Sequence, residues 1–291
     1  MKIGIGLPAT IPGVKGSLFL EWAKRADAGP FSSLSIVDRL VFPNYESLIA
    51  LAAAAAVTSR VRLVTSILLA PTRATAWLAK QTATLDAISN GRLTLGLGIG
   101  ARQDDFAAAG ETFKTRARRF EKQIVTLKNI WSGQPMGEGI GSIGPVPVQK
   151  PGPELLIGGY SPAAIQRAGR LGDGFISGGS GDAAQFRQTS QLVTDAWNEA
   201  GRQGKPRFVA CFYSVNGPEK MDQAEAYLRS YYGFMGPMVD RMVQGLPRTP
   251  DAIRRVIDGF ANIGVVDEVI LWPTVAELEQ LDRYADLVSK L

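Results

Sequence analysis

Residues 61–98 read VRLVTSILLAPTRATAWLAKQTATLDAISNGRLTLGLG, and this stretch decides the fold. It opens on an apolar, β-branched run at 61–67 and closes on a second apolar run at 93–98, with a segment of helical pattern between them. A strand, a helix and a strand in succession form a unit whose two strands lie parallel in one sheet. The stretch therefore predicts a parallel sheet covered by helices.

The same alternation continues in both directions from this unit. Apolar residues recur at helical spacing over 120–131 and over 278–288. The expected strands are Lys2–Leu7, Ser33–Val37, Val61–Ile67, Leu93–Gly98, Glu154–Ile157, Gly174–Ser177, Arg207–Val215 and Glu268–Trp272. An open doubly wound sheet more often stops at about five or six strands, whereas eight units linked by crossovers close most simply into a barrel. We expect an α/β fold, a single (β/α)8 TIM-barrel domain over residues 1–291 with inserted loops.

Two stretches break the alternation and predict insertions. Ser132 to Pro153 is rich in Gly and Pro, and Pro218 to Pro250 contains the run Tyr231-Tyr232-Gly233-Phe234-Met235. Both are interpreted as inserted loops. The second is long enough to act as a lid, because long loops in compact domains are usually functional or disordered, and an extra surface helix explains it equally well.

The composition excludes several kinds of chemistry. The chain has no histidine, which removes histidine-based triads, histidine-ligated metals and imidazole acid–base catalysis. Cys211 is the only cysteine and lies in an apolar run, so we interpret it as a small core residue and expect neither a disulfide nor a metal site.

The net charge and the hydropathy of the chain restrict the kinds of partner that it can bind. The net charge of +5 comes from scattered residues, which disfavours nucleic acid and suits an anionic cofactor or substrate, although a solvated surface explains it equally well. The longest apolar stretch, residues 48–57, is shorter than the roughly 20 residues that cross a bilayer. The first residues run straight into a strand pattern without a leader. We expect no membrane span and a cytoplasmic location.

Active sites of such barrels lie at the carboxyl ends of the strands, so the junctions after the strands hold the candidate residues. Asp38-Arg39 follows the second strand, Ser66-Ile67 ends the third with Arg73 beyond it, and Gly98-Ile99-Gly100-Ala101-Arg102 follows the fourth. Asp38 and Arg39 are either an anion or proton handler or a structural ion pair. Arg73 and Arg102 are interpreted as surface charges on loops that face the site.

The junctions after the fifth and sixth strands predict a phosphate site. The chain reads Gly158-Gly159-Tyr160-Ser161-Pro162 after one and Ser177-Gly178-Gly179 after the other. Glycines let backbone approach an anion closely, and Ser161 followed by proline is typical of a capped helix N-terminus. Exposed N–H groups there bind phosphate, so a phosphorylated cofactor is expected. Ordinary turns with a capped helix are the alternative.

Several linked motifs resemble the luciferase-like monooxygenase family. They are residues 59–71 (SRVRLVTSILLAP), 79–86 (AKQTATLD), 90–92 (NGR), 96–100 (GLGIG), 147–153 (PVQKPGP), 157–164 (IGGYSPAA), 172–175 (GDGF) and 267–271 (DEVIL). They follow one another in the right order over nearly the whole chain. The resemblance implies a barrel that binds reduced FMN or the deazaflavin coenzyme, with the ring at the mouth and the phosphate near the fifth and sixth strands.

The resemblance also implies particular residues. A non-proline cis peptide often ends the third strand of these proteins, and the matching residues are Ser66 and Ile67. Deazaflavin-dependent members often have histidine at the position of Arg39, and some deazaflavin dehydrogenases have a glutamate acid at the position of Ala101. An arginine at position 39 holds a substrate anion or stabilises negative charge on the reduced cofactor, since guanidinium stays protonated. A homodimer is implied as well.

The sequence thus favours an enzyme in which reduced FMN, supplied by a separate reductase, uses oxygen to oxygenate a small organic substrate. Asp38 and Arg39 are its predicted catalytic residues. Hydride transfer with the deazaflavin is the close alternative, and a flavin-binding protein without turnover is the third. Substrate contacts are expected from the variable segments, at Tyr231, Tyr232, Phe234, Met235 and Trp272, although Trp272 is equally well explained as a packing residue.

Overall fold

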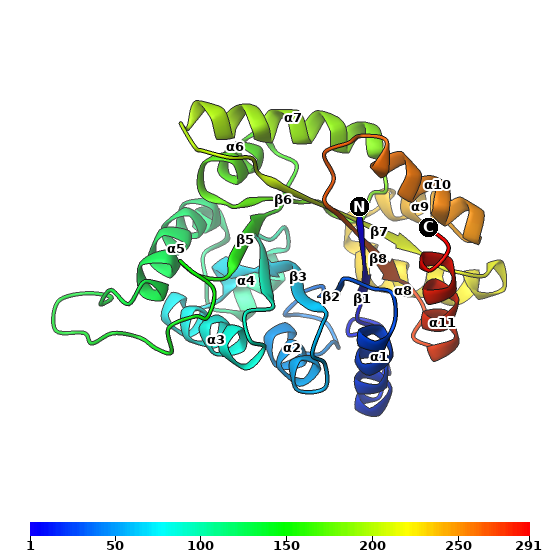
Figure 1. The fold of residues 1–291 in the computed structure, drawn as a ribbon, viewed down its shortest axis with the longest axis horizontal. Coiled ribbons are helices and arrows are strands. Elements are labelled where there is room, and N and C mark those ends of the chain that lie inside the picture. Colours follow the sequence, from blue (N-terminus) through cyan, green and yellow to red (C-terminus); the bar gives the residue numbers. More distant parts are fainter.

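A computed structural model describes all 291 residues and forms a closed barrel of eight parallel strands in the order β1 to β8, with the last strand pairing with the first. Figure 1 shows the strands at the centre and the helices outside them. The strands are β1 Lys2–Gly6, β2 Ser33–Ile36, β3 Arg62–Leu69, β4 Leu93–Gly98, β5 Glu154–Ile157, β6 Gly174–Ile176, β7 Arg207–Ser214 and β8 Glu268–Pro273. The predicted barrel is confirmed, and the predicted strand bounds differ from the observed ones by at most two residues.

Eleven α-helices and four 3-10 turns connect or follow the strands. The helices are α1 Gly16–Ala28, α2 Ser47–Ala56, α3 Thr75–Ile88, α4 Gln103–Ala108, α5 Arg116–Trp131, α6 Pro162–Leu171, α7 Ala183–Glu199, α8 Met221–Tyr232, α9 Met238–Gln244, α10 Pro250–Ala261 and α11 Leu278–Val288. Four helices start where a side chain accepts a backbone N–H at the N-cap, at Glu46, Ser161, Asp182 and Thr249. Local sequence signals therefore fix where the chain leaves the mouth of the barrel.

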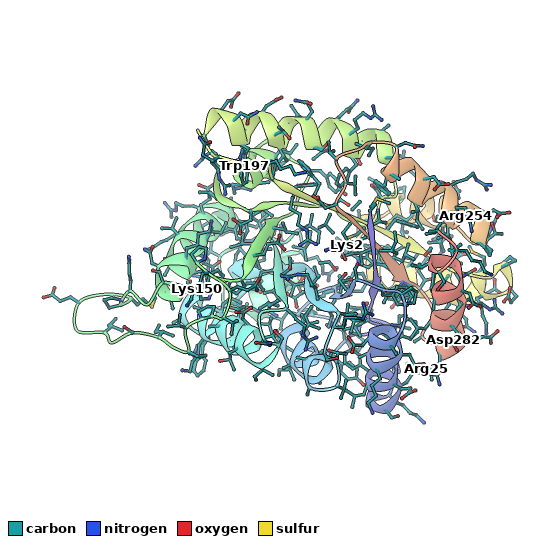
Figure 2. All side chains as sticks on the ribbon, in the orientation of Figure 1. Lys2, Arg25, Lys150, Trp197, Arg254 and Asp282 are labelled. Carbon is teal, nitrogen blue, oxygen red and sulfur yellow. The ribbon has the colours of Figure 1, made fainter.

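The barrel interior and the layer beneath the helices are apolar. The fully buried large side chains include Trp22, Phe31, Phe120 and Phe175. Cys211 is buried on β7 and unpaired, as predicted, and burial raises the pKa of its thiol. Figure 2 shows how the last helix closes the ring against the first, where Arg25 donates to Asp282 at 3.1 Å. No helix of the structure has the length and apolar character needed to cross a membrane.

The two inserted segments differ in secondary structure. Residues 132–153 contain only an isolated bridge between Gly137 and Ile140, and they extend from the body as an arm after α5 (Figure 1). The interpretation of 218–250 as a loop is wrong, because this segment forms α8, a 3-10 turn at Gly233–Met235 and α9. Helix α8 forms because Ala224, Tyr227, Leu228 and Tyr231 recur at helical spacing and bury one face. The alternative of an extra helix is the one observed.

Candidate functional site

A pocket of about 200 Å³ lies at the carboxyl ends of the strands, as the barrel architecture predicts. Its lining includes five predicted site residues, namely Asp38, Arg39, Ser66, Ile67 and Gly178. It also includes four of the five predicted substrate contacts, which are Tyr231, Tyr232, Phe234 and Trp272. Residues more than 190 positions apart in the chain thus meet at one mouth, and the insertion supplies much of its aromatic wall.

The end of β3 forms the floor of this pocket. The Ser66–Ile67 peptide is cis, as the family resemblance implied. The pairing of β3 with β4 shifts register between Thr65 and Leu68, at this same place. A Cβ built on Gly98 would lie 2.9 Å from the Ile67 side chain, and one built on Gly158 would lie 2.1 Å from it. These two glycines leave room for Ile67, which gives them a packing role beneath the floor of the pocket.

Asp38 is held by four hydrogen bonds. Its carboxylate accepts from Ser47 Oγ at 2.8 Å, from the Leu69 backbone N–H at 2.9 Å, and from both terminal nitrogens of Arg73 at 2.9 and 3.1 Å. Burial opposes a charge on Arg73, but Asp38 and Glu46 outweigh it and raise the pKa of the guanidinium. The arrangement is a buried, bidentate ion pair that fastens the end of β2 to the end of β3. The interpretation of Arg73 as a surface charge is wrong.

Arg39 is surrounded by aromatic rings. Its guanidinium carbon lies 4.5 Å from the ring centroid of Phe42, 5.1 Å from that of Tyr231 and 5.7 Å from that of Phe234. Its only hydrogen bond runs from Nη1 to the Tyr231 carbonyl, at 2.6 Å. Burial, followed by the positive charge of Arg102, lowers the pKa of Arg39. The Arg39 cation is therefore stacked on rings and lacks a carboxylate partner.

Asp105 was missed by sequence reasoning, and Arg102, which was placed on a loop that faces the site, was misjudged as a surface charge. Arg102, interpreted as a surface charge, has only 15% of its side chain exposed, lies 4.5 Å from the Phe234 ring centroid and pairs with Asp104. Asp105 is fully buried and accepts from the backbone N–H groups of Leu40 and Val41, at 3.1 and 2.7 Å. Asp105 thus holds the chain after Arg39 in place. The only signal in the sequence was the position of both residues after the fourth strand.

The loops after β5 and β6 lie together, as the predicted phosphate site requires. Tyr160 donates from its hydroxyl to the Gly178 carbonyl at 3.2 Å, which ties the two loops to each other. Ser161 caps α6 by accepting from the Ala164 N–H, and Pro162 occupies the first turn. Gly159 has a φ of 132°, a conformation that favours glycine. The capped N-terminus of α6 therefore stands beside a glycine that lines the pocket.

Other predicted cofactor residues do not line the pocket. They are Gly98, Ile99, Gly100, Gly158, Gly159, Tyr160, Ser161, Ser177 and Gly179. Ser177 is buried, and its Oγ accepts from the Cys211 N–H at 3.0 Å, so it joins β6 to β7. The Gly100 carbonyl accepts from Arg116 at 3.2 Å. A Cβ on Gly179 would lie 2.7 Å from the Tyr213 ring, which shows how tightly this loop packs.

Tyr231 and Tyr232 form an aromatic wall of the pocket, and Tyr213 packs against Tyr232 outside the lining. Tyr213 and Tyr232 share a hydrogen bond of 3.0 Å between their hydroxyls, and Tyr231 donates to the Asp38 carbonyl at 3.3 Å. Burial raises the pKa of all three tyrosines. They are neutral over the physiological range and serve as rigid, water-excluding walls. Trp272 completes this wall and donates from Nε1 to Ser35 at 3.1 Å.

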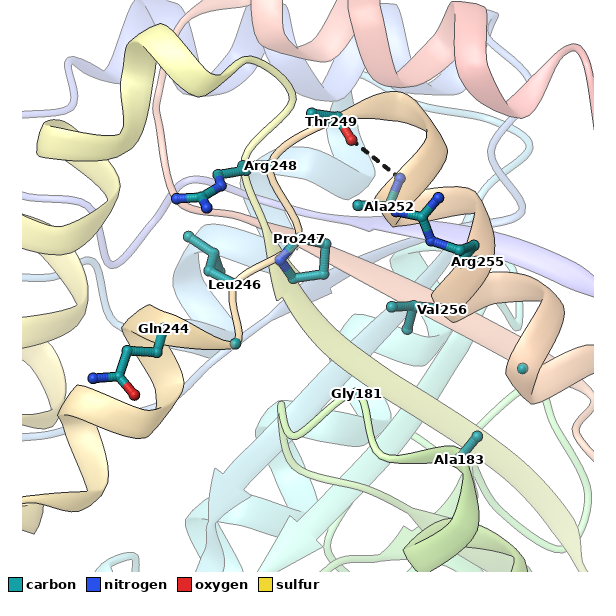
Figure 3. A pocket seen from close by; sticks show the side chains of 12 residues that line it. Gly181, Ala183, Gln244, Leu246, Pro247, Arg248, Thr249, Ala252, Arg255 and Val256 are labelled. Atoms are coloured by element: carbon teal, nitrogen blue, oxygen red, sulfur yellow. Dashed lines mark hydrogen bonds between the residues drawn. The ribbon is translucent and has the colours of Figure 1, made fainter.

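A wider hollow of about 530 Å³ opens between α10 and the loop after β6. Figure 3 shows Arg248 and Arg255 on its rim and Thr249, which caps α10 by accepting from the Ala252 N–H at 3.2 Å. Both arginines are exposed, so water solvates their charges. The hollow is larger than the mouth pocket but holds neither the Ser66–Ile67 floor nor the aromatic wall.

Two of the sequence relatives have names that state different cofactors, and a third is uncharacterized. The chain is 32% identical over 147 residues to an FMNH(2)-dependent dimethylsulfone monooxygenase of Pseudomonas putida, which covers 47% of this chain and 40% of the relative. It is 29% identical over 227 residues to an F420-dependent glucose-6-phosphate dehydrogenase of Kribbella flavida, covering 69% of this chain and 65% of the relative. An uncharacterized protein of Mycobacterium tuberculosis is 29% identical over 214 residues, or 64% of this chain and 73% of that protein.

Solved structures share the whole fold. A monooxygenase from Streptomyces bottropensis matches with a TM-score of 0.81 at 24% identity, over 100% of this chain and 98% of its own. An F420-dependent secondary alcohol dehydrogenase matches with a TM-score of 0.81 at 17% identity, over 99% and 98%. The family model of luciferase-like monooxygenases matches residues 1–278. The chain belongs to the luciferase-like monooxygenase family.

Proposed function

We propose that this protein is a monooxygenase that uses reduced FMN and oxygen to oxygenate a small organic substrate at the mouth of the barrel. The proposal rests mainly on the position of Gly178. It lines the pocket and also accepts the Tyr160 hydroxyl, and the residue after Tyr160 caps the N-terminus of α6. A binding site for a flat ring and a binding site for a phosphate are thus adjacent, and one residue connects them.

The residues present fit a flavin. The Ser66–Ile67 floor would hold the ring, and the Ser161 hydroxyl with the Ala163 N–H at the start of α6 would hold the phosphate. The bound cofactor would supply the electrons and the reaction with oxygen. The chain supplies positioning and a wall that excludes water, which supports a reaction that water would divert. Reduced cofactor is proposed to come from a separate reductase.

Asp38 acts in this proposal as a positioning residue. Its carboxylate already accepts four hydrogen bonds, two of them from Arg73, so it has little capacity left to take a proton from a substrate. By fastening Leu69 and Ser47 it fixes the ends of β2 and β3 around the pocket. Arg39, the next residue, then projects from a fixed backbone.

Hydride transfer with the deazaflavin is the second candidate, because relatives of both kinds exist. Position 39 favours FMN. Deazaflavin-dependent members often have histidine there, and this chain has an arginine and no histidine at all. A flavin-binding protein without turnover is the third candidate, and the pocket beside Ser66 and Ile67 argues against it, since a non-catalytic binder needs no space for a second molecule.

Anaerobic titration of the purified protein separates these candidates. Reduced FMN and reduced deazaflavin are added separately, binding is followed by absorbance and fluorescence, and air is then admitted. We expect saturable binding of reduced FMN and reoxidation kinetics that differ from those of free reduced FMN. Selective binding of the deazaflavin, with no response to air, would replace the proposal by hydride transfer. Binding of neither cofactor would contradict both.

We also propose that the protein forms a homodimer through the outer face of α2 and α3. Ile49, Trp77 and Ile88 are exposed on this face to 71, 65 and 59%, around a hollow of about 300 Å³. Lys80 is the only charged residue that lines the hollow. Two copies related by a two-fold axis would therefore bring only one charged side chain each to the hollow and would bury all three apolar side chains.

Light scattering on Trp77→Glu tests the dimer. We expect the unchanged protein to have the mass of two chains and the variant to have the mass of one, because a carboxylate would be buried at the contact. Leu192→Glu is the matched control, since Leu192 is exposed to 51% on α7, away from this face. A single-chain mass for the unchanged protein, or a dimer that survives the change at Trp77, would overturn the assignment.

A further inference from the structure

Three buried polar atoms at the mouth pocket have no hydrogen-bond partner. They are Nε of Arg39, Nε of Arg102 and Oδ2 of Asp105, and all three residues line the pocket. A buried group left without a partner is destabilising, so folded proteins rarely keep several together without a reason. Two of the three atoms are guanidinium N–H donors on the same cavity. Arg102 Nε and Asp105 Oδ2 lie 3.6 Å from each other, so Arg39 Nε is the donor of this set that faces no carboxylate of the chain within 4.0 Å.

The charges point to the same ligand. Arg102 is balanced by Asp104 and by Asp105, whose Oδ2 lies 3.6 Å from the Arg102 Nε. Arg39 forms no ion pair with any carboxylate within 4.0 Å, although burial and the charge of Arg102 lower its pKa. A guanidinium stays protonated even so. The Arg39 charge is therefore partly buried and interacts with Asp104 and Asp105 only from beyond ion-pair distance, and an anion in the pocket would pair with it directly.

The aromatic rings fix how the two guanidinium groups present their donors. Phe234 lies within 5.7 Å of the Arg39 guanidinium carbon and within 4.5 Å of that of Arg102. A guanidinium stacked on a ring keeps its N–H groups at its edges, where a planar oxyanion is bound by parallel hydrogen bonds. Phe234 is itself 48% exposed in the turn between α8 and α9. It stands over the entrance where an incoming anion would pass.

The rest of the pocket is apolar. Ile67, Tyr232 and Trp272 are among the apolar and aromatic residues that line it. Its volume of about 200 Å³ suits a small molecule. A ligand that fits both halves has a charged oxyanion at one end and a compact apolar body at the other.

We propose that the substrate is a small organic acid whose carboxylate is bound by Arg39 and Arg102 and whose apolar body lies against Tyr232 and Trp272. This inference rests on the proposed function, which assigns the pocket to a cofactor and a substrate. It goes further by naming the chemical class of the substrate. It also assigns a role to the inserted residues 218–250, because Phe234 orients both arginines.

Binding of benzoate, compared with the uncharged benzamide of the same shape, tests the proposal. Calorimetry is performed on the protein alone and again on the protein loaded with FMN. We expect benzoate to bind at least ten times more tightly than benzamide. Arg39→Met should weaken benzoate binding about 10- to 100-fold, the value of hydrogen bonds to a charged group, and leave benzamide binding within about twofold. Arg102→Met should weaken it similarly.

Two further variants keep the result interpretable. Arg39→Lys retains the charge without the planar fork, so an intermediate loss of benzoate affinity is expected even if the methionine variant folds poorly. Arg229→Met is the matched control, because Arg229 lies on α8 in an exposed pair with Glu225 and should leave benzoate affinity unchanged.

Each other outcome has a distinct meaning. Equal affinity for benzoate and benzamide, or benzoate affinity untouched by Arg39→Met, would overturn the organic acid. If Arg39→Met instead weakens only the binding of reduced FMN, the arginine serves the cofactor and the inference is wrong. Absence of FMN binding by the unchanged protein contradicts the proposed function alone, since benzoate binding is measured without the cofactor as well.

Discussion

The charged side chains at the two ends of the barrel differ in how completely they are paired and hydrogen-bonded. At the amino ends of the strands, Arg62, Glu154, Arg207 and Glu268 form one connected network, and Glu268 also accepts from the hydroxyls of two serines. None of its side-chain atoms is left buried without a partner. At the carboxyl ends, the mouth pocket holds three of the seven such atoms in the molecule.

The difference separates stability from function. A saturated network holds the strand starts together and has no donor to spare for a ligand. An unsaturated set of groups contributes less to folding and has donors free for binding. One sequence pattern, a charged residue at a strand end, thus has opposite uses at the two ends. The predictions below perturb one end at a time.

Alkaline pH should destabilise the protein through the tyrosines at the mouth of the barrel. It should not act through the charged network at the amino ends of the strands, which we call the base network. Burial raises the pKa of Tyr213, Tyr231 and Tyr232 above the ordinary value of 10. In the unfolded chain these tyrosines ionise near pH 10, whereas in the fold they stay neutral. Their contribution to stability is therefore fully present below pH 10 and is lost as the pH rises toward the folded-state values. Each tyrosine contributes up to about 1.4 kcal/mol per pH unit, so the three together give about 4.

Urea unfolding and tyrosinate absorbance between about pH 9 and pH 11 measure this loss. The base network consists of arginines and glutamates and contains no tyrosine. Tyr232→Phe should reduce the slope of the free energy of unfolding by about 1.4 kcal/mol per pH unit. A stability that stays flat across the window would show that these hydroxyls are not as buried as the structure has them.

Removing one charge from the base network should lower the free energy of unfolding by about 3 kcal/mol. Glu268 is 1% exposed and pairs with Arg207, and Glu268→Gln leaves that arginine with Glu154 alone. Loss of one partner from a buried pair costs about 3–5 kcal/mol, and the remaining partner places this change at the lower end. Urea denaturation measures the free energy of unfolding.

The matched control for that change is Glu279→Gln. Glu279 pairs with Arg283 on the surface, and 64% of its side chain is exposed. Surface pairs contribute at most about 1 kcal/mol, so the control should be nearly neutral. Equal costs for the two glutamates would mean that the base network adds nothing through its burial.

Filling the space beneath the floor should affect both stability and binding. A Cβ on Gly158 would lie 2.1 Å from the Ile67 side chain and 3.0 Å from the Ile176 carbonyl. Gly158→Ala should destabilise by about 1–3 kcal/mol, as overpacking does, and should push Ile67 toward the pocket and weaken FMN binding. Gly16→Ala is the control, because nothing lies within 4 Å of a Cβ there.

The double variant Gly158→Ala with Ile67→Ala tests the cause. If the clash with Ile67 is responsible, the second change should restore part of the FMN affinity, and the two effects should not add. Additive losses would mean that Gly158 acts through its backbone, as the sequence alone predicted for a cofactor-binding glycine.

Much of the fold could be predicted from the sequence, and the reason lies in the strands. Apolar runs such as Glu154–Ile157 have no helical spacing and lie between turn residues, so their bounds were predicted to the residue. The segment 218–250 was misjudged as a loop because its glycines and prolines outweighed the helical spacing of the tyrosines in α8. Helical patterns that are interrupted by such residues are difficult to recognise locally.

The site was harder to predict than the fold. Asp38 and Arg39 were identified because they follow a strand, but their separate tasks depend on Arg73 and Phe234, which are distant in sequence. The packing role of Gly158 depends on Ile67, about 90 residues earlier. Contacts of this range leave no local pattern, so composition and spacing indicate the mouth without indicating which charges are satisfied there.

The smallest effect on stability should come from the residue with the least satisfied charge. Arg39→Met removes one hydrogen bond, to the Tyr231 carbonyl, and also removes a partly buried cation that has no carboxylate partner. The two effects oppose each other, so the free energy of unfolding should change by less than about 1 kcal/mol. Arg73→Met, the same substitution at a residue paired bidentately with Asp38, should cost about 3 kcal/mol or more. Urea denaturation of both variants gives the comparison directly. A cost at Arg39 that equals the cost at Arg73 would mean that the fold already satisfies the Arg39 charge, and the mouth would then have no cation free for an incoming acid.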